Sequence, residues 1–423
     1  LPGGISVRSR RDRTGRVKET SFLDKTDELR RIRYLWEPGD LLKERDDSLR
    51  GKALYFHDQR ARLMGSDEPG VGVLWRRPTP SGNIQQALET EPQEYGKNGA
   101  LVKSNGIEYR YDFDGNRIAA IYPDQRRETY TWDDLGRLIE VRGVDSSIVR
   151  FSYDALGRRI KKTSAKDECV YVCDGDVVLH ELSLHATPIT WMFEPGTYTP
   201  IAKVHGLRRY AIVADQVGAP NAAFDEWGGI AWQGAVDVFG RALVDIERTA
   251  IPWRYPGQYG DEETGLLYNR FRYYDPDTGA YISKDPIGLL GGLNAYGYVD
   301  DPLLMGDPLG LAPQPFTRPI SWPSWKNVPI DMNEVSSGHM PGGWRLAPGN
   351  HKDIFQADWS KDTVERSIRR AYQNVDTLVD MNKDKRRILL EGPGRGYRIQ
   401  FWYDKDSRMI TTAYPKGPTK CGK

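Results

Sequence analysis

The sequence predicts a mainly β protein in which a long row of β-hairpins is followed by a small α+β domain. Two observations carry this prediction: a hairpin-like unit repeats at a fixed step of 21 residues, and the composition changes abruptly after residue 311. The chain has 423 residues, enough for two or three domains with sizeable cores. Its mean hydropathy of −0.63 and the lack of a long apolar run argue against a membrane span.

The repeating unit is an aromatic residue followed by Asp-x-x-Gly. It reads YDFDGNR from Tyr111, WDDLGR from Trp132 and YDALGRR from Tyr153, with a looser echo, RDRTGR, at 11–16. Segments between the units, such as RETYTW and IVRFSY, alternate as strands do, and the glycine suits a tight turn. One hairpin cannot bury its apolar face, so we expect the hairpins to stack side by side into a curved sheet.

These repeats resemble the tyrosine-aspartate (YD) repeats of Rhs proteins, and residues 254–311 are similar to the Rhs core terminus. The resemblance implies a large β-cage of wound strands that encloses a toxin carried at the C-terminus. We therefore expect residues 1–253 to be a segment of the cage and 254–311 to carry a self-cleavage site. The residues before 311 are too few to close such a cage. Because the chain also begins with Leu and shows no classical signal peptide, we interpret it as a fragment whose upstream part is missing.

The pentad Asp-Pro-hydrophobic-Gly-Leu occurs twice, at 285–289 and 307–311. Two carboxylates brought within about 3 Å cannot both ionise, so such a pair can activate water as general base and acid. Asp-Pro is also a common turn opening, and the spacing alone favours that reading.

The resemblance favours the chemical reading, because Rhs proteins cut themselves directly after the final pentad with these two aspartates. It implies that Asp285 and Asp307 act on the bond between Leu311 and Ala312. Asp300–Asp301 stands where the family usually has Asn-Pro, which predicts a further carboxylate near the pair.

A proline-rich segment, 312–330, follows the second pentad and is predicted to be an extended linker to a toxin domain at 331–423. Residues 312–423 carry 19 Lys/Arg and 12 Asp/Glu, a net charge of +7, which leaves −6 for residues 1–311. A basic tail on an acidic body suggests an anionic partner such as nucleic acid, although ordinary surface variation explains it equally well. The three cysteines form no disulfide framework.

The toxin domain is predicted to hold one helix and a strand meander. Ser360 can cap the helix, which places Val364, Ile368, Ala371 or Tyr372, and Val375 on one face. The meander is expected at 386–391, 397–403 and 408–414. In its last strand Thr412 and Tyr414 should point the same way.

Two histidines, His339 and His351, lie twelve positions apart in a Gly/Pro-rich stretch. A histidine pair can serve as general base and general acid at neutral pH. Both could instead be exposed loop residues. A metal site is a weaker alternative, because no Cys, HExxH or carboxylate cluster completes it, and we expect no cofactor.

Residues 335–416 resemble the EndoU-type ribonucleases in the histidine stretch and in the final ITTAYPK. The resemblance implies that His339 and His351 are base and acid, that Thr412 and Tyr414 bind the base and ribose, and that Lys383 or Lys385 stabilises the transition state. RNA would be cut to a 2′,3′-cyclic phosphate and a 5′-OH, because only RNA has the 2′-hydroxyl.

Other toxin classes remain open at this point. The chain lacks the R…STS…ExE pattern of ADP-ribosyltransferases and the HxE…PCxxC pattern of deaminases, while a metal-dependent nuclease or a non-enzymatic domain that binds nucleic acid or membrane stays an alternative. The Rhs reading also implies a cognate immunity protein, an upstream cage with secretion spike components, and contact-dependent export, of type VI, into the cytoplasm of a target cell.

Overall fold

The computed structural model describes residues 1–13, 15–25, 27–86, 93–96, 98–315, 330–333, 335, 360–373, 377–381, 387–393, 397–404 and 409–418. Contacts divide the chain into two compact units. The first comprises residues 1–10 and 17–317, and the second comprises residues 11–16 and 318–423.

The first unit begins with a short 3-10 helix, η1 (Pro2–Gly4), and a seven-stranded antiparallel sheet whose strands pair in chain order. Its strands are β1 (Ile5–Arg11), β2 (Val17–Asp24), β3 (Asp27–Glu37), β4 (Leu41–Asp47), β5 (Gly51–His57), β6 (Leu63–Glu68) and β7 (Gly72–Trp75). A two-stranded sheet, β8 (Arg77–Pro78) and β9 (Ile84–Gln85), follows it.

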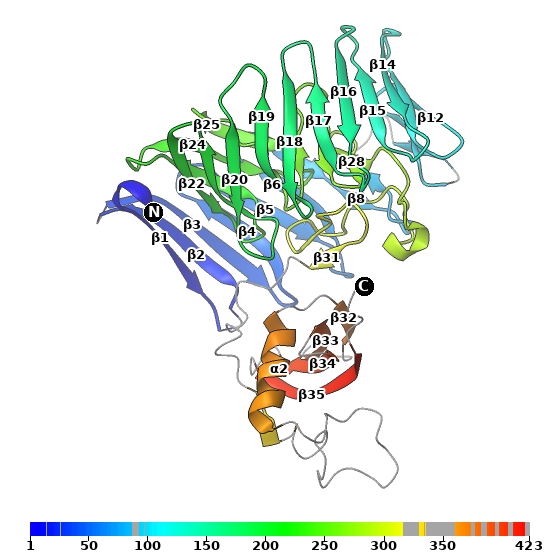
Figure 1. The fold of residues 1–423 in the computed structure, drawn as a ribbon. Coiled ribbons are helices and arrows are strands. Elements are labelled where there is room, and N and C mark those ends of the chain that lie inside the picture. The colour runs from blue at the N-terminus through cyan, green and yellow to red at the C-terminus, as the bar shows by residue number, and fades with distance from the viewer. Residues whose placement is uncertain are drawn as a thin grey trace. The chain divides into compact units, whose positions relative to one another are not determined.

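A sixteen-stranded sheet comes next, again with each strand paired to its neighbour in the chain, and it forms the curved wall drawn in cyan and green in Figure 1. Its strands are β10 (Glu94–Tyr95), β11 (Leu101–Ser104), β12 (Ile107–Tyr111), β13 (Arg117–Ile121), β14 (Arg127–Trp132), β15 (Leu138–Arg142), β16 (Ile148–Tyr153), β17 (Arg159–Thr163), β18 (Glu168–Asp174), β19 (Val177–Ser183), β20 (Ile189–Phe193), β21 (Pro200–His205), β22 (Arg208–Ala214), β23 (Pro220–Phe224), β24 (Ile230–Val236) and β25 (Ala242–Glu247). The predicted mainly β fold and its stacked hairpins are thereby confirmed.

The three repeat units form the turns between β12 and β13, between β14 and β15, and between β16 and β17. In the turn between β14 and β15, the carboxylate of Asp133 accepts the backbone N–H of Arg137 (2.9 Å) and its Nε–H (2.7 Å). Gly136 takes a φ of +71°, which a side chain would disfavour. Asp154 and Arg158 form the same pair of bonds 21 residues later, so the repeat is a repeated side-chain cap of a tight turn.

The concave side of the large sheet carries the main core. Buried side chains of the hairpins, among them Tyr130, Phe151 and Trp191, pack against Trp253 and Tyr273 from the following segment. A second cluster joins the seven-stranded sheet to the end of the large one. The segment after β25 is therefore held inside the sheet by apolar contact.

Two buried arginines of the large sheet also hold that inner segment. Arg117 donates from Nη1 to Asp275 (2.6 Å), and Arg159 pairs with Asp261. The guanidinium of Arg159 further lies over the rings of Tyr171 and Tyr268, among others. Buried charges need such partners, so these pairs fix the inner segment in one place.

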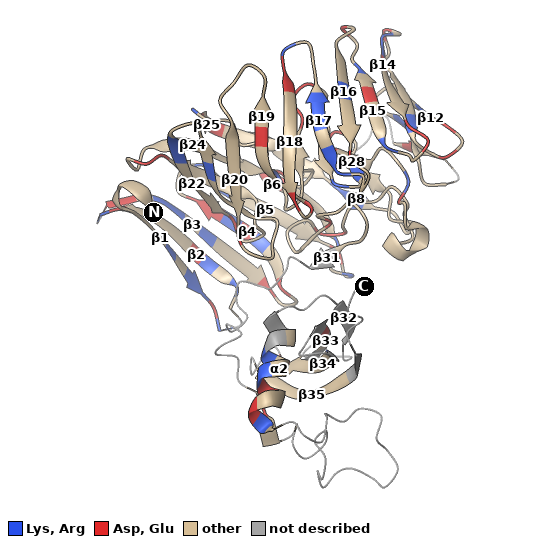
Figure 2. Ribbon diagram, in the orientation of Figure 1, with Lys and Arg blue, Asp and Glu red and all other residues tan. Residues whose placement is uncertain are grey.

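The outer face of the large sheet carries exposed apolar side chains, such as Val170 and Val172, together with charged residues that form cross-strand ion pairs (Figure 2). Arg150 and Glu140 are 2.9 Å apart, and Lys161 and Glu168 are 2.8 Å apart. Exposed ion pairs of this kind add little stability. Their charges favour contact of this face with solvent, while the opposite face of the sheet is buried.

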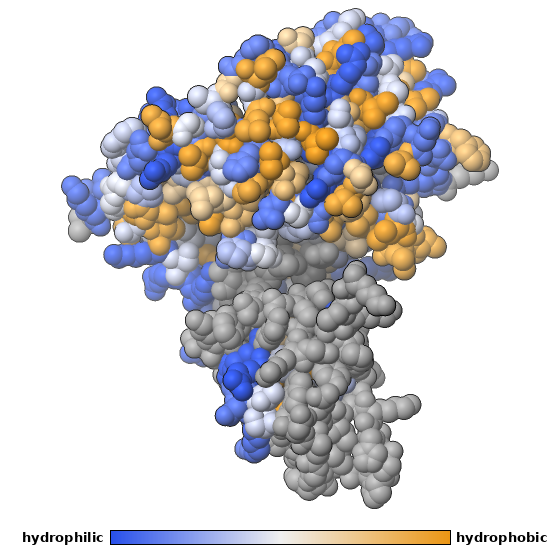
Figure 3. Space-filling model, in the orientation of Figure 1, coloured by the Kyte–Doolittle hydropathy of each residue, from blue (hydrophilic) through white to orange (hydrophobic). Residues whose placement is uncertain are grey.

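The inner segment forms a four-stranded antiparallel sheet followed by a 3-10 turn and a short hairpin. Its elements are β26 (Tyr259–Gly260), β27 (Leu267–Asn269), β28 (Arg272–Asp275), β29 (Ala280–Tyr281), η2 (Gly288–Gly291), β30 (Met305–Gly306) and β31 (Gln314–Pro315). Three leucines in and after η2 are 79% to 87% exposed, and Figure 3 shows apolar surface where Figure 1 draws η2.

Within the described residues of the second unit lie the helix α2 (Lys361–Gln373) and a four-stranded antiparallel sheet: β32 (Thr377–Met381), β33 (Arg387–Pro393), β34 (Tyr397–Asp404) and β35 (Met409–Pro418). Ser360 caps α2, accepting the N–H of Thr363 at 3.2 Å, and Val364 and Ile368 are fully buried. The prediction missed β32, because its sequence, TLVDM, is a single short run between polar stretches. Within the described residues, no helix has the length and apolar character to cross a membrane.

Candidate active site

The two pentads both fold as turns, and each aspartate caps its own turn. The carboxylate of Asp285 accepts the N–H of Ile287 at 3.0 Å. That of Asp307 accepts the N–H of Leu311 at 2.8 Å. Each aspartate can therefore both stabilise its turn and take part in chemistry, because the turn uses Oδ1 and leaves the second carboxylate oxygen, Oδ2, directed elsewhere.

Arg272 of β28 joins the two carboxylates. Its Nη2 lies 2.9 Å from Oδ2 of Asp285 and 3.1 Å from Oδ2 of Asp307. All three side chains are 2% to 3% exposed. A single cation thus sits against both buried carboxylates, which compensates the repulsion and desolvation that two such groups would otherwise suffer.

The rest of the Arg272 guanidinium binds the backbone of the second pentad and the backbone carbonyl that accepts the N–H of Asp285. Nε donates to the carbonyl of Gly310 (2.5 Å), and Nη1 donates to the carbonyl of Ala295 (3.1 Å). Its carbon lies 3.7 Å from the centre of the Tyr281 ring. The planar guanidinium of Arg272 therefore fixes the positions of the groups around it and also compensates the negative charge of the two carboxylates.

Asp307 has two further neighbours from the inner sheet. The hydroxyl of Tyr281 (β29) donates to its Oδ2 at 2.9 Å, and the amide of Asn269 (β27) donates to its backbone carbonyl at 2.8 Å. Burial raises the pKa of Tyr281 well above its usual range, and the Asp307 carboxylate raises it further. The phenol consequently stays protonated and remains a donor.

The bond between Leu311 and Ala312 lies beside both aspartates. Oδ1 of Asp307 accepts the N–H of Ala312 at 3.2 Å, so that carboxylate touches the nitrogen of this bond. On the other side, a Cβ at Gly291 would lie 2.1 Å from Oδ2 of Asp285 and 2.4 Å from the carbonyl oxygen of Leu311. Both oxygens therefore lie in the space that a side chain at position 291 would occupy.

The environments of the two carboxyls differ. Burial raises the pKa of Asp285 above its ordinary value; the Arg272 guanidinium opposes this rise, and the Asp307 carboxylate adds to it. Asp307 instead receives donors from Arg272, Tyr281 and two backbone N–H groups. Asp285 thus keeps its proton more readily than an ordinary aspartic acid, while Asp307 is the carboxylate that accepts more hydrogen bonds.

The additional carboxylate expected near the pair is engaged elsewhere. Oδ2 of Asp301 lies 3.0 Å from Nε2 of His57, and Oδ1 accepts the N–H of Leu303. The side chain of Asp300 is exposed.

Arg272, Tyr281 and Asn269 were missed by the reading of the sequence. Arg272 stands in RFRYYDP among aromatic residues, and an arginine inside an apolar strand is a signal that a buried anion faces it. The identity of that anion depends on packing between segments and cannot be derived from this strand alone.

The second unit, where a toxin domain is predicted, is described in part. Thr412 and Tyr414 lie on β35 opposite Trp402 and Gln400, half-buried and on the face away from buried Ala413. His339, His351, Lys383 and Lys385 lie outside the described residues. Among the residues that are described, no group of three His, Cys, Asp or Glu side chains is placed to hold a metal ion.

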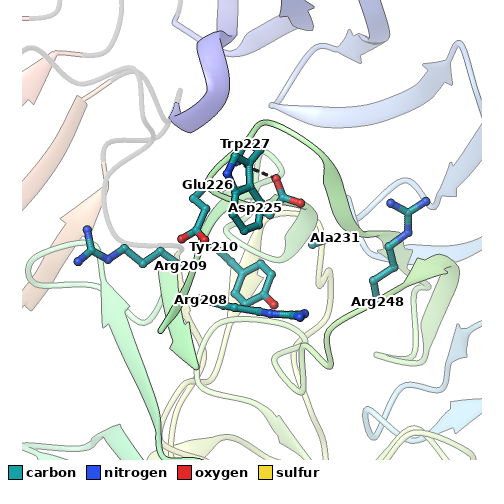
Figure 4. A pocket seen from close by; sticks show the side chains of 8 residues that line it. All are labelled: Arg208, Arg209, Tyr210, Asp225, Glu226, Trp227, Ala231 and Arg248. Carbon is teal, nitrogen blue, oxygen red and sulfur yellow. Dashed lines mark hydrogen bonds between the residues drawn. The ribbon is translucent and has the colours of Figure 1, made fainter. Parts of the chain in front are cut away.

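A hollow of about 380 Å³ lies at the turn between β23 and β24 (Figure 4). It is lined by Arg208, Arg209, Tyr210, Asp225, Glu226, Trp227, Ala231 and Arg248. The carboxylate of Asp225 is occupied by the N–H groups of Trp227 and Gly229, so it serves the turn. None of the residues around Arg272 lines this hollow.

The fold and this site define a β-shell whose inner segment ends in a two-aspartate centre. Residues 55–290 match the teneurin YD-shell family, and the chain belongs to that family. The predicted YD-repeat character is thereby confirmed.

Two relatives extend the comparison. The chain is 32% identical over 316 residues to "Double-stranded DNA deaminase toxin A" of Burkholderia cenocepacia (strain H111), covering 65% of this chain and 22% of the relative. It is 32% identical over 244 residues to "Probable deoxyribonuclease RhsA" of Dickeya dadantii (strain 3937), covering 53% of this chain and 17% of the relative. The match thus spans about a fifth of the length of either relative.

Among solved structures, the crystal structure of TcdB2-TccC3-Cdc42 resembles this fold. The TM-score is 0.50 at 16% identity, and the match covers 73% of this chain and 18% of that one. At this identity the likeness concerns the fold alone.

The glycine between the two oxygens gives a direct test. In a Gly291→Ala variant the new methyl group must displace either the Asp285 carboxylate or the Leu311 carbonyl. If these oxygens take part in cutting the Leu311–Ala312 bond, we expect cleavage to slow at least about tenfold, measured as conversion of the full chain to two bands on a denaturing gel. Leu290→Ala in the same turn, whose side chain is 85% exposed, is the control and should cleave normally.

Proposed function

We propose that this chain is part of an Rhs toxin that cuts its own Leu311–Ala312 bond with Asp285 and Asp307 and so frees the domain that follows. One observation carries the proposal: Asp307 accepts the N–H of Ala312 on the nitrogen side of that bond, while Asp285 and the Leu311 carbonyl oxygen both lie beside Gly291. Both ends of one peptide bond are thus served by separate carboxyl groups. Half-buried Leu311 and Ala312 leave room for water to approach.

The chemistry follows from these positions. Asp307 takes a proton from a water molecule as its oxygen attacks the carbonyl carbon of Leu311, and Asp285 gives its proton to the carbonyl oxygen. When the tetrahedral intermediate collapses, the C–N bond breaks, Asp307 passes its proton to the departing nitrogen of Ala312, and Asp285 recovers its own. The products are a carboxyl group on Leu311 and an amine on Ala312.

Arg272 and Tyr281 support this cycle. The guanidinium binds both carboxylates and the Gly310 carbonyl of the second turn. The phenol donates to the oxygen of Asp307 that does not accept the Leu311 and Ala312 N–H groups. Both groups keep the pair in place before the reaction begins, which lowers the cost of reaching the transition state.

The freed domain is proposed to be an enzymatic toxin, and in particular an EndoU-like endoribonuclease acting through His339, His351, Thr412 and Tyr414. The names of the relatives, a deaminase toxin and a deoxyribonuclease, support an enzyme acting on nucleic acid. The net charge of +7 on residues 312–423 suits a polyanionic substrate. A deaminase is less supported here, because residues 312–423 lack the HxE…PCxxC pattern.

An intracellular nuclease requires protection of the cell that makes it. We therefore propose a cognate immunity protein that binds residues 312–423, and delivery of the toxin through a longer Rhs cage by contact-dependent, type VI export into a target cell. The relatives are much longer than the matched region, which supports the larger cage.

Replacing Asp307 tests the proposed self-cleavage after Leu311. An Asp307→Asn variant keeps the shape of the turn but loses the base, so the chain should run as one uncleaved band on a denaturing gel. Asp154→Asn, in a turn of the large sheet, is the matched control and should give two bands. Unchanged cleavage of the Asp307→Asn chain would refute the proposed catalytic role of Asp285 and Asp307.

The raised pKa of Asp285 predicts the pH dependence. The neutral acid persists to higher pH than an ordinary aspartic acid, and it is lost as pH rises through that raised pKa. Because the mechanism needs the proton on Asp285, cleavage should slow as pH rises through that raised pKa. Precursor isolated in urea and diluted into buffers of increasing pH gives the rate; a rate that increases with pH would contradict the role of Asp285 as acid.

Sequencing of RNA ends tests the proposed endoribonuclease activity of the freed domain. After expression of the chain in cells without protection, the proposal predicts new RNA ends carrying 2′,3′-cyclic phosphates and 5′-hydroxyls. A His339→Ala chain that is still cleaved after Leu311 should produce none of them. Toxicity without RNA cuts, or cuts that persist in this variant, would point to another class of cargo.

A further inference from the structure

The segment that leads into Asp307 is bound by the seven-stranded sheet, whose strands lie more than 220 positions earlier in the chain. His57, the last residue of β5, places Nε2 3.0 Å from Oδ2 of Asp301, and both side chains are 3% exposed. Arg76 donates to the carbonyls of Val299 and Asp300, the latter at 2.7 Å. The N–H of Leu63, at the start of β6, also donates to the Asp300 carbonyl at 3.3 Å.

Asp301 transmits this contact to the active site. Its Oδ1 accepts the N–H of Leu303 at 2.8 Å, and its backbone carbonyl accepts the N–H of Met305 at 2.9 Å. Met305 and Gly306 form β30, and Asp307 follows directly. The buried side chain of Leu303 packs in the cluster of the seven-stranded sheet.

Asp307 is consequently held from two sides. The inner sheet binds its carboxylate and its carbonyl through Arg272, Tyr281 and Asn269. The seven-stranded sheet binds the turn immediately before it. Without that sheet, Oδ2 of Asp301 and the carbonyls of Val299 and Asp300 would lose these partners.

From this we infer that His57 and Arg76 are positioning residues of the self-cleavage site, and that they make the cut depend on docking of the seven-stranded sheet. This inference rests on the proposed self-cleavage. Neither residue touches the Leu311–Ala312 bond; both act through Asp301 and the Asp300 carbonyl. These contacts would set the order of two events. The seven-stranded sheet first docks onto the segment before Asp307, and only then is the domain after Leu311 released.

The test compares His57→Ala and Arg76→Met with Arg45→Met in the full chain. Arg45 pairs with Glu68 inside the same sheet, at 2.9 Å and with both side chains buried, but binds no residue of 299–307. Cleavage is followed by gel after dilution from urea, and the stability of each chain is measured on its uncleavable Asp307→Asn form. We expect His57→Ala and Arg76→Met to cleave at least about tenfold more slowly than Arg45→Met at equal loss of stability, because small displacements of a reacting group cost that much or more.

A second variant separates positioning from general damage. Asp301→Asn added to His57→Ala removes the buried carboxylate that lost its partner, while the amide oxygen can still accept the N–H of Leu303. Cleavage should recover at least in part, and failure to recover would overturn the role of the His57–Asp301 contact. Equal slowing of all three single variants in proportion to lost stability, or normal cleavage by His57→Ala and Arg76→Met, would overturn the dependence on docking.

The Asp307→Asn chain distinguishes this inference from the proposal beneath it. If that chain is still cut, the aspartate pair is refuted and the positioning role falls with it. If it is uncut while His57→Ala and Arg76→Met cleave normally, only the positioning role is refuted.

Discussion

One guanidinium group makes the centre of this protein feasible. Arg272 faces two buried carboxylates through a single nitrogen. Its other two nitrogens bind the carbonyl of Gly310, in the second pentad, and the carbonyl of Ala295, which also accepts the N–H of Asp285. Removing the cation would leave two like charges in a dry site, which proteins avoid by protonation or by rearrangement. Arg272 therefore both compensates the two negative charges and fixes the positions of the carboxylates. The position of the Leu311–Ala312 bond depends on this one side chain.

The position of Arg272 depends in turn on the shell around it. Its strand also carries Asp275, which pairs with Arg117 of the large sheet, and the neighbouring segment carries Asp261, which pairs with Arg159. Together with the aromatic core, these contacts hold the inner sheet against a wall formed by residues far away in the sequence. The active site is thus a product of the assembled shell, and the contacts of His57 and Arg76 extend this dependence to the first sheet.

Much of this could be predicted from particular residues. The turns at Asp133 and Asp154 were visible because an aspartate, a glycine and an arginine within five positions close a turn by themselves. The two aspartates of the pentads were visible as a repeated motif. Arg272, Tyr281 and Asn269 were not, because nothing within their own strands states which distant turn will lie against them. Asp301 was expected beside the pair and instead meets His57, 244 positions away.

The sequence by itself determined the hairpin repeat, the mainly β class, the pentads and the change of composition after residue 311. Each of these is local: turn capping, alternation and composition act over a few residues or a single repeat. Only the tertiary structure decided that Asp285 and Asp307 share one arginine, that Gly291 leaves space for the Leu311 carbonyl, and that the first sheet supports the segment before Asp307. These are contacts between segments distant in the chain, set by which buried charges and carbonyls find partners when the layers close.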